Sequence, residues 1–260
     1  MAGPSDVDKS PAPAVTRAAA ILTLLAQEGR PLGLTDIART LGLAKSSTLN
    51  LCVALEQTGL VTKNELGYGL GRKTVELGGA YVRGFDLIRE FYRVCADSPV
   101  LQHELLQIAI LDGTSVLYLA RHEGRAPLRL SATVGDRFPA TVTAVGAVLL
   151  AELDPAEVAA RFDNPEALPT WTPRSTDTIE RLLAKLAETR ERGYSVDEGE
   201  TNAGVYGLAV LLPPRRHGDP PLALGASLMA NSATPDYVET VVTALREARE
   251  RLTSPSLVVD

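Results

Sequence analysis

Short polar side chains at residues 45–50 have the composition of a nucleic-acid contact. Ser46, Ser47 and Asn50 can donate and accept hydrogen bonds to phosphates or base edges, and an asparagine can form two hydrogen bonds with adenine. Lys45 directly precedes them, where its charge suits a phosphate. These four residues are therefore expected to contact double-stranded DNA.

The densest group of carboxylates near an apolar strand is formed by Asp197, Glu198 and Glu200. Such a group could transfer protons or hold a cation. Acidic loop residues are more often simply solvated. The sequence shows no Gly-x-Ser-x-Gly elbow and no serine with a plausible base. We therefore expect no catalytic residues and no enzymatic activity.

The residues that most often bind metals are dispersed. His103, His122 and His217 include no pair spaced for one helical turn, and Cys52 and Cys95 lie in separate helical patterns. Two cysteines do not make a disulfide scaffold and fit a reducing cytoplasm. The sequence predicts neither a metal site nor a cofactor.

Two further motifs have plain structural interpretations. The run Gly67-Tyr68-Gly69-Leu70-Gly71 resembles half of a nucleotide-binding loop, but no βαβ pattern surrounds it. We interpret its glycines as shaping a β-wing. The basic run Arg215-Arg216-His217 lies between prolines and is interpreted as an exposed loop.

Apolar spacing near the N-terminus predicts the elements that would position Lys45 to Asn50. The expected elements are a helix closed near Gly29, helices over 34–41 and 45–57, and short strands over 60–63 and 66–70. Three helices followed by a hairpin make a winged helix-turn-helix, with the third helix as the reader of the major groove. The dipole of that helix would assist Lys45 at its start.

Three cations of the same region are placed to hold the flanking DNA backbone: Arg17 in the first helix, and Lys63 and Arg72 around the wing. The alternative is a winged helix that contacts proteins. Residues 1–75 carry a net charge of +2, whereas the rest of the chain carries -8 within a total of -6. This asymmetry favours DNA as the partner.

The second part of the chain mixes strands and helices. A helical pattern from Arg72 to about Asp97 is interrupted at Gly84 and restarts with Asp86 as the expected N-cap. The segments that follow predict an α+β sheet domain. Its expected strands are Leu106–Leu111, Ser115–Ala120, Pro127–Ala132, Gly207–Leu212 and Leu222–Ala230, and its expected helices are Thr143–Leu153, Pro155–Phe162, Asp177–Arg192 and Pro235–Leu252 with Thr234 as N-cap. No apolar run is long enough for a membrane span, and no secretory signal is visible, so we expect a cytoplasmic protein without membrane contact.

An ordered set of motifs resembles the IclR family of bacterial transcriptional regulators over nearly the whole chain after residue 13. The motifs are Gly42-Leu43-Ala44-Lys45-Ser46-Ser47, Leu55-Glu56-Gln57-Thr58-Gly59-Leu60-Val61, Tyr68-Gly69-Leu70-Gly71 with Glu76-Leu77-Gly78, Ile110-Leu111-Asp112-Gly113, Val134 to Ala140, Ala144-Val145-Gly146, and Arg190 to Asp197 with Glu200 and Gly204.

The resemblance implies a winged helix-turn-helix DNA-binding domain, a linker helix and a GAF-like effector domain with a central antiparallel sheet. It implies a homodimer or homotetramer on a palindromic operator, and no enzymatic activity. A small-molecule metabolite would change the geometry of the assembly and so its operator binding. The expected segments are a disordered arm (1–13), the DNA-binding domain (14–71), the linker (72–85), the effector domain (86–254) and a tail (255–260). The competing interpretation is a small-molecule-binding or catalytic α+β domain with a winged helix for protein contacts.

The resemblance also implies an effector pocket in which Asp197 and Ser227 are the polar anchors of an otherwise apolar lining. Its residues would be Pro127, Leu130, Ala144, Asp197, Val205, Gly207, Ser227 and Met229. The acidic group at 197–200 then becomes one wall of this pocket. Four positions depart from the family pattern: Asn50 replaces a frequent basic residue, Ala147 a frequent lysine, Gly207 a frequent cysteine, and Met229 a small polar residue.

Overall fold

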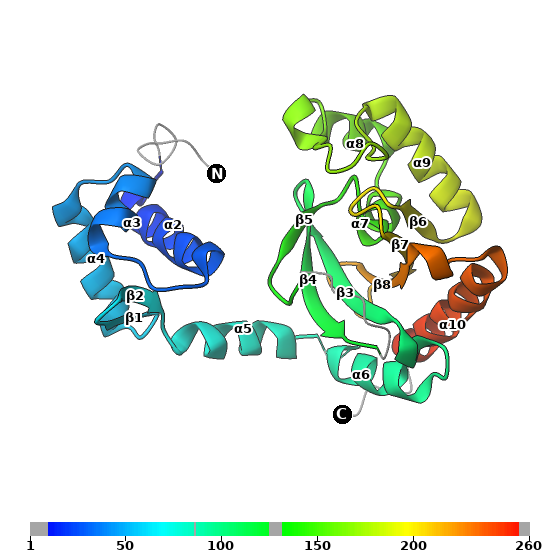
Figure 1. Cartoon of the computed structure of the whole chain (residues 1–260), viewed down its shortest axis with the longest axis horizontal. Helices are drawn as coiled ribbons and strands as arrows, with labels where there is room; N and C mark the ends of the chain where they lie inside the picture. The colour runs from blue at the N-terminus through cyan, green and yellow to red at the C-terminus, as the bar shows by residue number, and fades with distance from the viewer. Residues whose placement is uncertain (1–9, 86, 125–131, 255–260) are drawn as a thin grey trace. The chain divides into compact units, whose positions relative to one another are not determined.

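The chain folds into two compact units, residues 1–84 and 85–260, and each is described by itself (Figure 1). A computed structural model describes residues 10–85, 87–124 and 132–254. In these ranges no helix is long and apolar enough to cross a membrane. Several predictions fall outside the described residues: the arm at 1–9, the cap at Asp86, most of the strand Pro127–Ala132, the pocket residues Pro127 and Leu130, and the tail 255–260.

The N-terminal unit has the predicted order of three helices and a hairpin. Its elements are α2 (Pro13–Glu28), α3 (Leu34–Leu41), α4 (Lys45–Gln57), β1 (Val61–Asn64) and β2 (Gly67–Leu70). One apolar cluster joins all of them and includes Ile21, Ile37, Cys52, Val61 and Tyr68. The buried residues of α4 are Thr48, Cys52 and Leu55, which lie at helical spacing along its inner side, where Leu51 is half-buried.

The glycine run from Gly67 to Gly71 lies in and directly after the second strand of the wing. Strands β1 and β2 are antiparallel, and Tyr68 of β2 also forms a bridge with Leu32. A Cβ atom on Gly67 would lie 2.3 Å from the Leu32 carbonyl oxygen, and one on Gly71 would lie 2.1 Å from the Gly59 carbonyl oxygen. Both glycines are therefore required by close backbone contacts, in agreement with their interpretation as wing residues.

Helix α5 (Lys73–Arg83) follows the wing and ends at Gly84, where the sequence predicted an interruption. None of its residues is buried, and Val75, Leu77 and Tyr81 are exposed large side chains. The isolated unit therefore gives this helix little tertiary support.

The C-terminal unit is built on one six-stranded antiparallel sheet in the order β5-β4-β3-β8-β7-β6. The strands are β3 (Leu105–Asp112), β4 (Ser115–His122), β5 (Arg137–Pro139), β6 (Ser195–Glu198), β7 (Val205–Leu212) and β8 (Leu222–Met229). The helices are α6 (Leu87–Asp97), α7 (Ala144–Leu150), α8 (Pro155–Arg161), α9 (Ile179–Arg192) and α10 (Pro235–Thr253), with short 3-10 turns η1 (Leu101–His103), η2 (Pro165–Ala167) and η3 (Ala230–Ser232). As predicted, the Thr234 side chain caps α10 by accepting a hydrogen bond from the Tyr237 amide.

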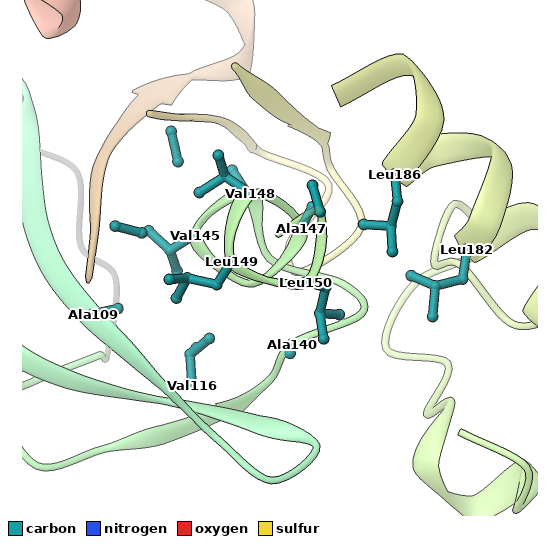
Figure 2. Close-up of a cluster of buried hydrophobic side chains, with 14 of the residues drawn as sticks. Ala109, Val116, Ala140, Val145, Ala147, Val148, Leu149, Leu150, Leu182 and Leu186 are labelled. Carbon is teal, nitrogen blue, oxygen red and sulfur yellow. The ribbon is translucent and has the colours of Figure 1, made fainter. Parts of the chain in front are cut away.

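Helix α7 is the centre of a buried apolar cluster, and all seven of its residues are buried. Figure 2 shows it enclosed between strand residues such as Ala109 and Val116 on one side and Leu182 and Leu186 of α9 on the other. Small residues on the sheet let it approach closely: a Cβ atom on Gly225 would lie only 2.6 Å from Val145 Cγ1. Helices α6 and α10 pack together, and α10 also packs on β7 and β8.

Two strands were missed in the sequence. No strand is predicted from the sequence at Arg137–Pro139 or Ser195–Glu198, where the acidic residues near 197 were expected in a loop. Both segments are edge strands of only three and four residues, too short to show the apolar alternation that marks a strand. The correction matters because β6 carries Asp197.

Candidate functional site

The outward side of α4 presents the residues predicted to contact DNA. Lys45 is the first residue of the helix, and Lys45, Ser46 and Asn50 are exposed, while Ser47 is half-buried. Thr48 is buried and donates a hydrogen bond to the Ala44 carbonyl oxygen at 3.1 Å. The inner residues therefore hold α4 against the core of the N-terminal unit, and the polar outer residues are available to contact a partner.

The flanking cations lie on three other elements of the same unit. Lys63 is exposed on β1 with its Nζ 5.5 Å from the centre of the Tyr68 ring. Arg72 is exposed at the start of α5, and Arg17 is half-buried in α2. The described unit thus has cations on the recognition helix, on the wing and on the first helix.

A cavity of about 260 Å³ lies in the C-terminal unit between the start of α7 and the sheet. Five residues of the predicted pocket line it: Ala144, Asp197, Val205, Gly207 and Ser227. The other described lining residues were not predicted; they are Gln107, Tyr118, Ala132, Phe138, Thr143, Val145, Trp171, Thr201, Asn202, Leu208, Gly225 and Ala226. Met229 is half-buried at the end of β8 and is not among the described residues that line the cavity.

Strand register places Asp197, Gly207 and Ser227 side by side. Gly207 of β7 is paired with Asp197 of β6 on one side and with Ser227 of β8 on the other. A Cβ atom on Gly207 would lie 3.1 Å from Asp197 Cβ and 3.4 Å from Ala144 Cβ. Glycine at this position therefore leaves space between the two polar side chains.

Asp197 is only 4% exposed, and its carboxylate is held by the loop that follows β6. Its Oδ1 accepts a hydrogen bond from the Glu200 amide at 2.5 Å, and its Oδ2 accepts one from Thr201 Oγ1 at 2.8 Å. Burial raises the pKa of Asp197 to about 6, although the bonds from Thr201 and Glu200 and the charge of Lys185 oppose the rise. This carboxyl group therefore titrates close to neutral pH.

The other two carboxylates of the acidic group do not line this cavity. Glu198 is exposed. Glu200 is buried and turned toward α9, where its Oε1 accepts a hydrogen bond from Lys185 Nζ at 2.5 Å and its Oε2 accepts one from Thr176 Oγ1 at 2.6 Å. The expectation that the whole group forms a pocket wall is therefore too broad: Asp197 belongs to the cavity, and Glu200 anchors the loop that holds Asp197.

Three aromatic rings complete the cavity, and none of them was predicted as a site residue from the sequence. Tyr118 and Phe138 lie edge to face with ring centres 5.5 Å apart, and Phe138 and Trp171 do the same at 5.1 Å. They come from β4, β5 and the loop before α9. Residues this far apart in sequence leave no spacing signal, and Phe138 stood out only as part of a family motif.

No group of three or more His, Cys, Asp or Glu side chains in the described part of the chain could hold a metal ion. A winged helix-turn-helix combined with a second unit that encloses a partly polar cavity defines a class of proteins: DNA-binding regulators that respond to a small molecule.

Comparison with known proteins identifies the family within this class. Residues 14–65 match the model of the IclR helix-turn-helix domain, and residues 79–253 match that of the bacterial transcriptional regulator IclR C-terminal domain. The chain belongs to the IclR family of bacterial transcriptional regulators. It is a DNA-binding transcriptional regulator with an effector-binding C-terminal domain and not an enzyme, so the catalytic part of the competing interpretation is wrong.

Individual relatives agree with this assignment. The HTH-type transcriptional regulator XynR of Escherichia coli (strain K12) is 34% identical over 198 residues, which cover 75% of this chain and 78% of XynR. A solved IclR transcriptional regulator from Alicyclobacillus acidocaldarius has 27% identity and a TM-score of 0.79, with 93% of this chain and 97% of that chain covered. An IclR homologue from Microbacterium hydrocarbonoxydans, solved in complex with 4-hydroxybenzoate, shares the fold at 24% identity and a TM-score of 0.77, with 92% and 97% covered.

Proposed function

We propose that the outer side of α4 reads the operator sequence. Ser46, Ser47 and Asn50 would contact base edges in the major groove, with Asn50 placed to read an adenine, and Lys45 would bind a phosphate at the start of the helix. The exposure of Lys45, Ser46 and Asn50 on a helix whose opposite side is buried supports this assignment.

We further propose that Arg17, Lys63 and Arg72 hold the DNA backbone on either side of α4. The protein would act in the cytoplasm. It would bind as a homodimer or homotetramer, because two copies of the N-terminal DNA-binding unit match the two halves of a palindromic operator. The combined positive charge of the N-terminal units of the assembled copies would make operator binding sensitive to salt.

We propose that the effector binds in the cavity beside α7, with Asp197 and Ser227 as its polar anchors. The observation that carries this proposal is the row Asp197–Gly207–Ser227, which places two polar side chains around a gap at the cavity wall. Polar groups that can orient a ligand, set beside apolar and aromatic side chains, are typical of small-molecule sites. Pro127, Leu130 and Met229 stay predictions for this site.

The effector would control DNA binding by favouring one arrangement of the N-terminal DNA-binding units in the assembly. A ligand changes operator affinity only if it binds two arrangements with different affinities, and the arrangement it favours sets the spacing of the half-sites. Cavity occupancy and operator affinity are then coupled in both directions.

The test is a gel-shift assay with DNA from upstream of the regulator's own gene. Thermal-shift screening of organic acids, aromatic acids and amino-acid metabolites supplies the effector, with 4-hydroxybenzoate as the first probe because a relative was solved with it. We expect Asp197→Ala to bind the operator like the wild type but to lose the effector response. Glu198→Ala, which removes an exposed neighbouring carboxylate, should respond normally.

Two results would contradict the proposal. An unchanged effector response in Asp197→Ala would remove Asp197 from the site. Absence of salt-sensitive, palindrome-specific binding to the upstream DNA, or to DNA of neighbouring genes, would remove the assignment of α4 as an operator reader.

A further inference from the structure

Tyr118, Phe138 and Trp171 form a continuous aromatic wall along one side of the cavity. The chain has seven tyrosines, four phenylalanines and one tryptophan, so three rings around a single cavity are a concentration of a scarce residue type. Each neighbouring pair lies edge to face, the arrangement that aromatic rings prefer. A further ring can extend such a stack.

Trp171 is 46% exposed, although large apolar side chains are usually buried. Its position is nevertheless fixed by the backbone of its loop. The Trp171 amide donates to Ser175 Oγ at 3.0 Å, and the Thr172 amide donates to the same oxygen at 2.9 Å. The Trp171 ring is therefore held at the cavity with part of its surface exposed. A bound ligand could cover this exposed surface.

The loop that carries Trp171 is tied to the segment that carries Asp197. Thr172 Oγ1 donates to the Gly199 carbonyl oxygen at 2.7 Å, and Ser175 Oγ donates to the Glu200 carbonyl oxygen at 2.8 Å. These bonds join the aromatic wall and the buried carboxylate into one hydrogen-bonded assembly. A ligand that touches both would meet a preorganised site.

Asp197 gives the cavity an acceptor for a ligand that donates a hydrogen bond. Among the described lining residues there is no Lys, Arg or His, and Asp197 is the carboxylate. A carboxylate oxygen can accept about two hydrogen bonds. Oδ2 accepts one described bond, from Thr201, and so can accept another from a ligand hydroxyl.

The cavity is large enough for one ring. A cavity of about 150 Å³ lined by apolar side chains is known to hold benzene. The cavity here, at about 260 Å³, has room for one substituted ring.

We propose that the effector is a monocyclic aromatic compound with a hydroxyl group, whose ring packs on Phe138 and Trp171 and whose hydroxyl donates to Asp197. This inference rests on the proposed function of the cavity as the effector site. It adds the chemical class of the ligand and two residues, Phe138 and Trp171, that select it.

A matched pair of compounds tests the class on the full-length protein. Benzyl alcohol and cyclohexylmethanol have the same heavy-atom skeleton and the same primary hydroxyl, but only the first is aromatic. Calorimetric titration should show the aromatic compound binding about tenfold more tightly, the effect of one or two aromatic contacts. As the single tryptophan of the chain, Trp171 should also report the binding by a change in fluorescence.

Variants then test whether Trp171 causes the difference in affinity between the aromatic and the saturated compound. Trp171→Leu keeps an apolar side chain and should cut the affinity for the aromatic compound about fivefold to tenfold, with little change for the saturated one. Tyr92→Leu, which replaces an exposed aromatic residue of α6 that does not line the cavity, is the control and should change neither affinity. Thermal melts of both variants verify folding.

Three outcomes overturn the proposed class: equal affinity for the two compounds, tighter binding of the saturated one, or no binding of either at millimolar concentration. If a non-aromatic compound such as gluconate binds and Asp197→Ala abolishes its binding, the effector site stands and only the aromatic class fails. If the aromatic compound binds and Asp197→Ala leaves its affinity unchanged, the assignment of the hydroxyl to Asp197 fails together with the proposed site.

Discussion

Asp197 makes the stability of the C-terminal unit depend on pH. Its pKa in the folded protein is about 6, above the ordinary value of 3.8, because burial disfavours the charged carboxylate. The folded state therefore holds a proton more tightly than the unfolded state does. The stabilisation linked to this proton is complete below about pH 4 and is lost as the pH rises through 6.

We predict that the free energy of unfolding of the wild type, relative to Asp197→Asn, falls by up to about 3 kcal/mol between pH 4 and pH 7. The amide variant has no proton to lose in this range. Urea unfolding followed by Trp171 fluorescence reports on this unit, since Trp171 lies beside the cavity. Asp163→Asn, at an exposed carboxylate, controls for the loss of a charge. A difference that stays constant with pH would show that Asp197 does not titrate as described.

At the scale of the element, different residues of helix α4 are expected to set the affinity for any DNA and the specificity for the operator. We predict that Lys45→Ala weakens binding to all DNA sequences and lowers the slope of log Kd against log salt by about one per recognition helix bound. Asn50→Ala should instead reduce the preference for the operator about tenfold or more at one base pair of each half-site. Anisotropy titrations on the operator and on single-base variants measure both effects.

Arg30→Ala supplies the control for α4, because Arg30 is an exposed cation of the same unit that pairs with Glu28 outside the reading helix. It should leave the operator preference unchanged. If Lys45→Ala and Asn50→Ala alter only the melting temperature, the assignment of the outer side of α4 is wrong.

Helices could be predicted from this sequence better than edge strands could. The spacing of buried residues predicted α3 and α4 with the bounds that the structure shows, since each helix buries one regular stripe. Strands β5 and β6 have three and four residues and are held by their neighbours in the sheet, so their own sequences carry little signal.

The candidate site could be predicted only in part for a related reason. Asp197, Gly207 and Ser227 were reached through family resemblance, because strand pairing brings them together from three separate segments. Tyr118 and Trp171 meet Phe138 through the tertiary fold alone. The ion pair of Glu200 with Lys185 also depends on how α9 packs, and no spacing in the sequence indicates it.

At the scale of the whole molecule, charge is divided between the reading and sensing parts. Residues 1–75 carry +2 and the remainder -8. We propose that the acidic C-terminal unit repels DNA and lowers binding to random sequences, so that operator choice would depend on the N-terminal DNA-binding units. The overall charge of -6 therefore does not argue against DNA binding.

We predict that the salt dependence of operator binding maps to the N-terminal unit. Lys63→Ala should lower the salt slope by about one per wing in contact with DNA. Replacing Glu188 and Glu191, two exposed acids of α9, by Gln should leave that slope unchanged and strengthen binding to random DNA. Titrations at several salt concentrations decide this, and a slope that follows the α9 changes instead would refute the division of roles.

Gly207 differs from the glycines that the fold requires. Gly67 and Gly225 are fixed by contacts that a Cβ atom would violate, at 2.3 and 2.6 Å, whereas a Cβ atom on Gly207 would meet side-chain atoms at 3.1 and 3.4 Å. Its backbone is not in the left-handed region either. A single substitution at Gly207 can therefore narrow the space between Asp197 and Ser227 while the sheet stays intact. The ligand range of this regulator can thus diverge between descendant lineages one residue at a time, without first rebuilding the domain.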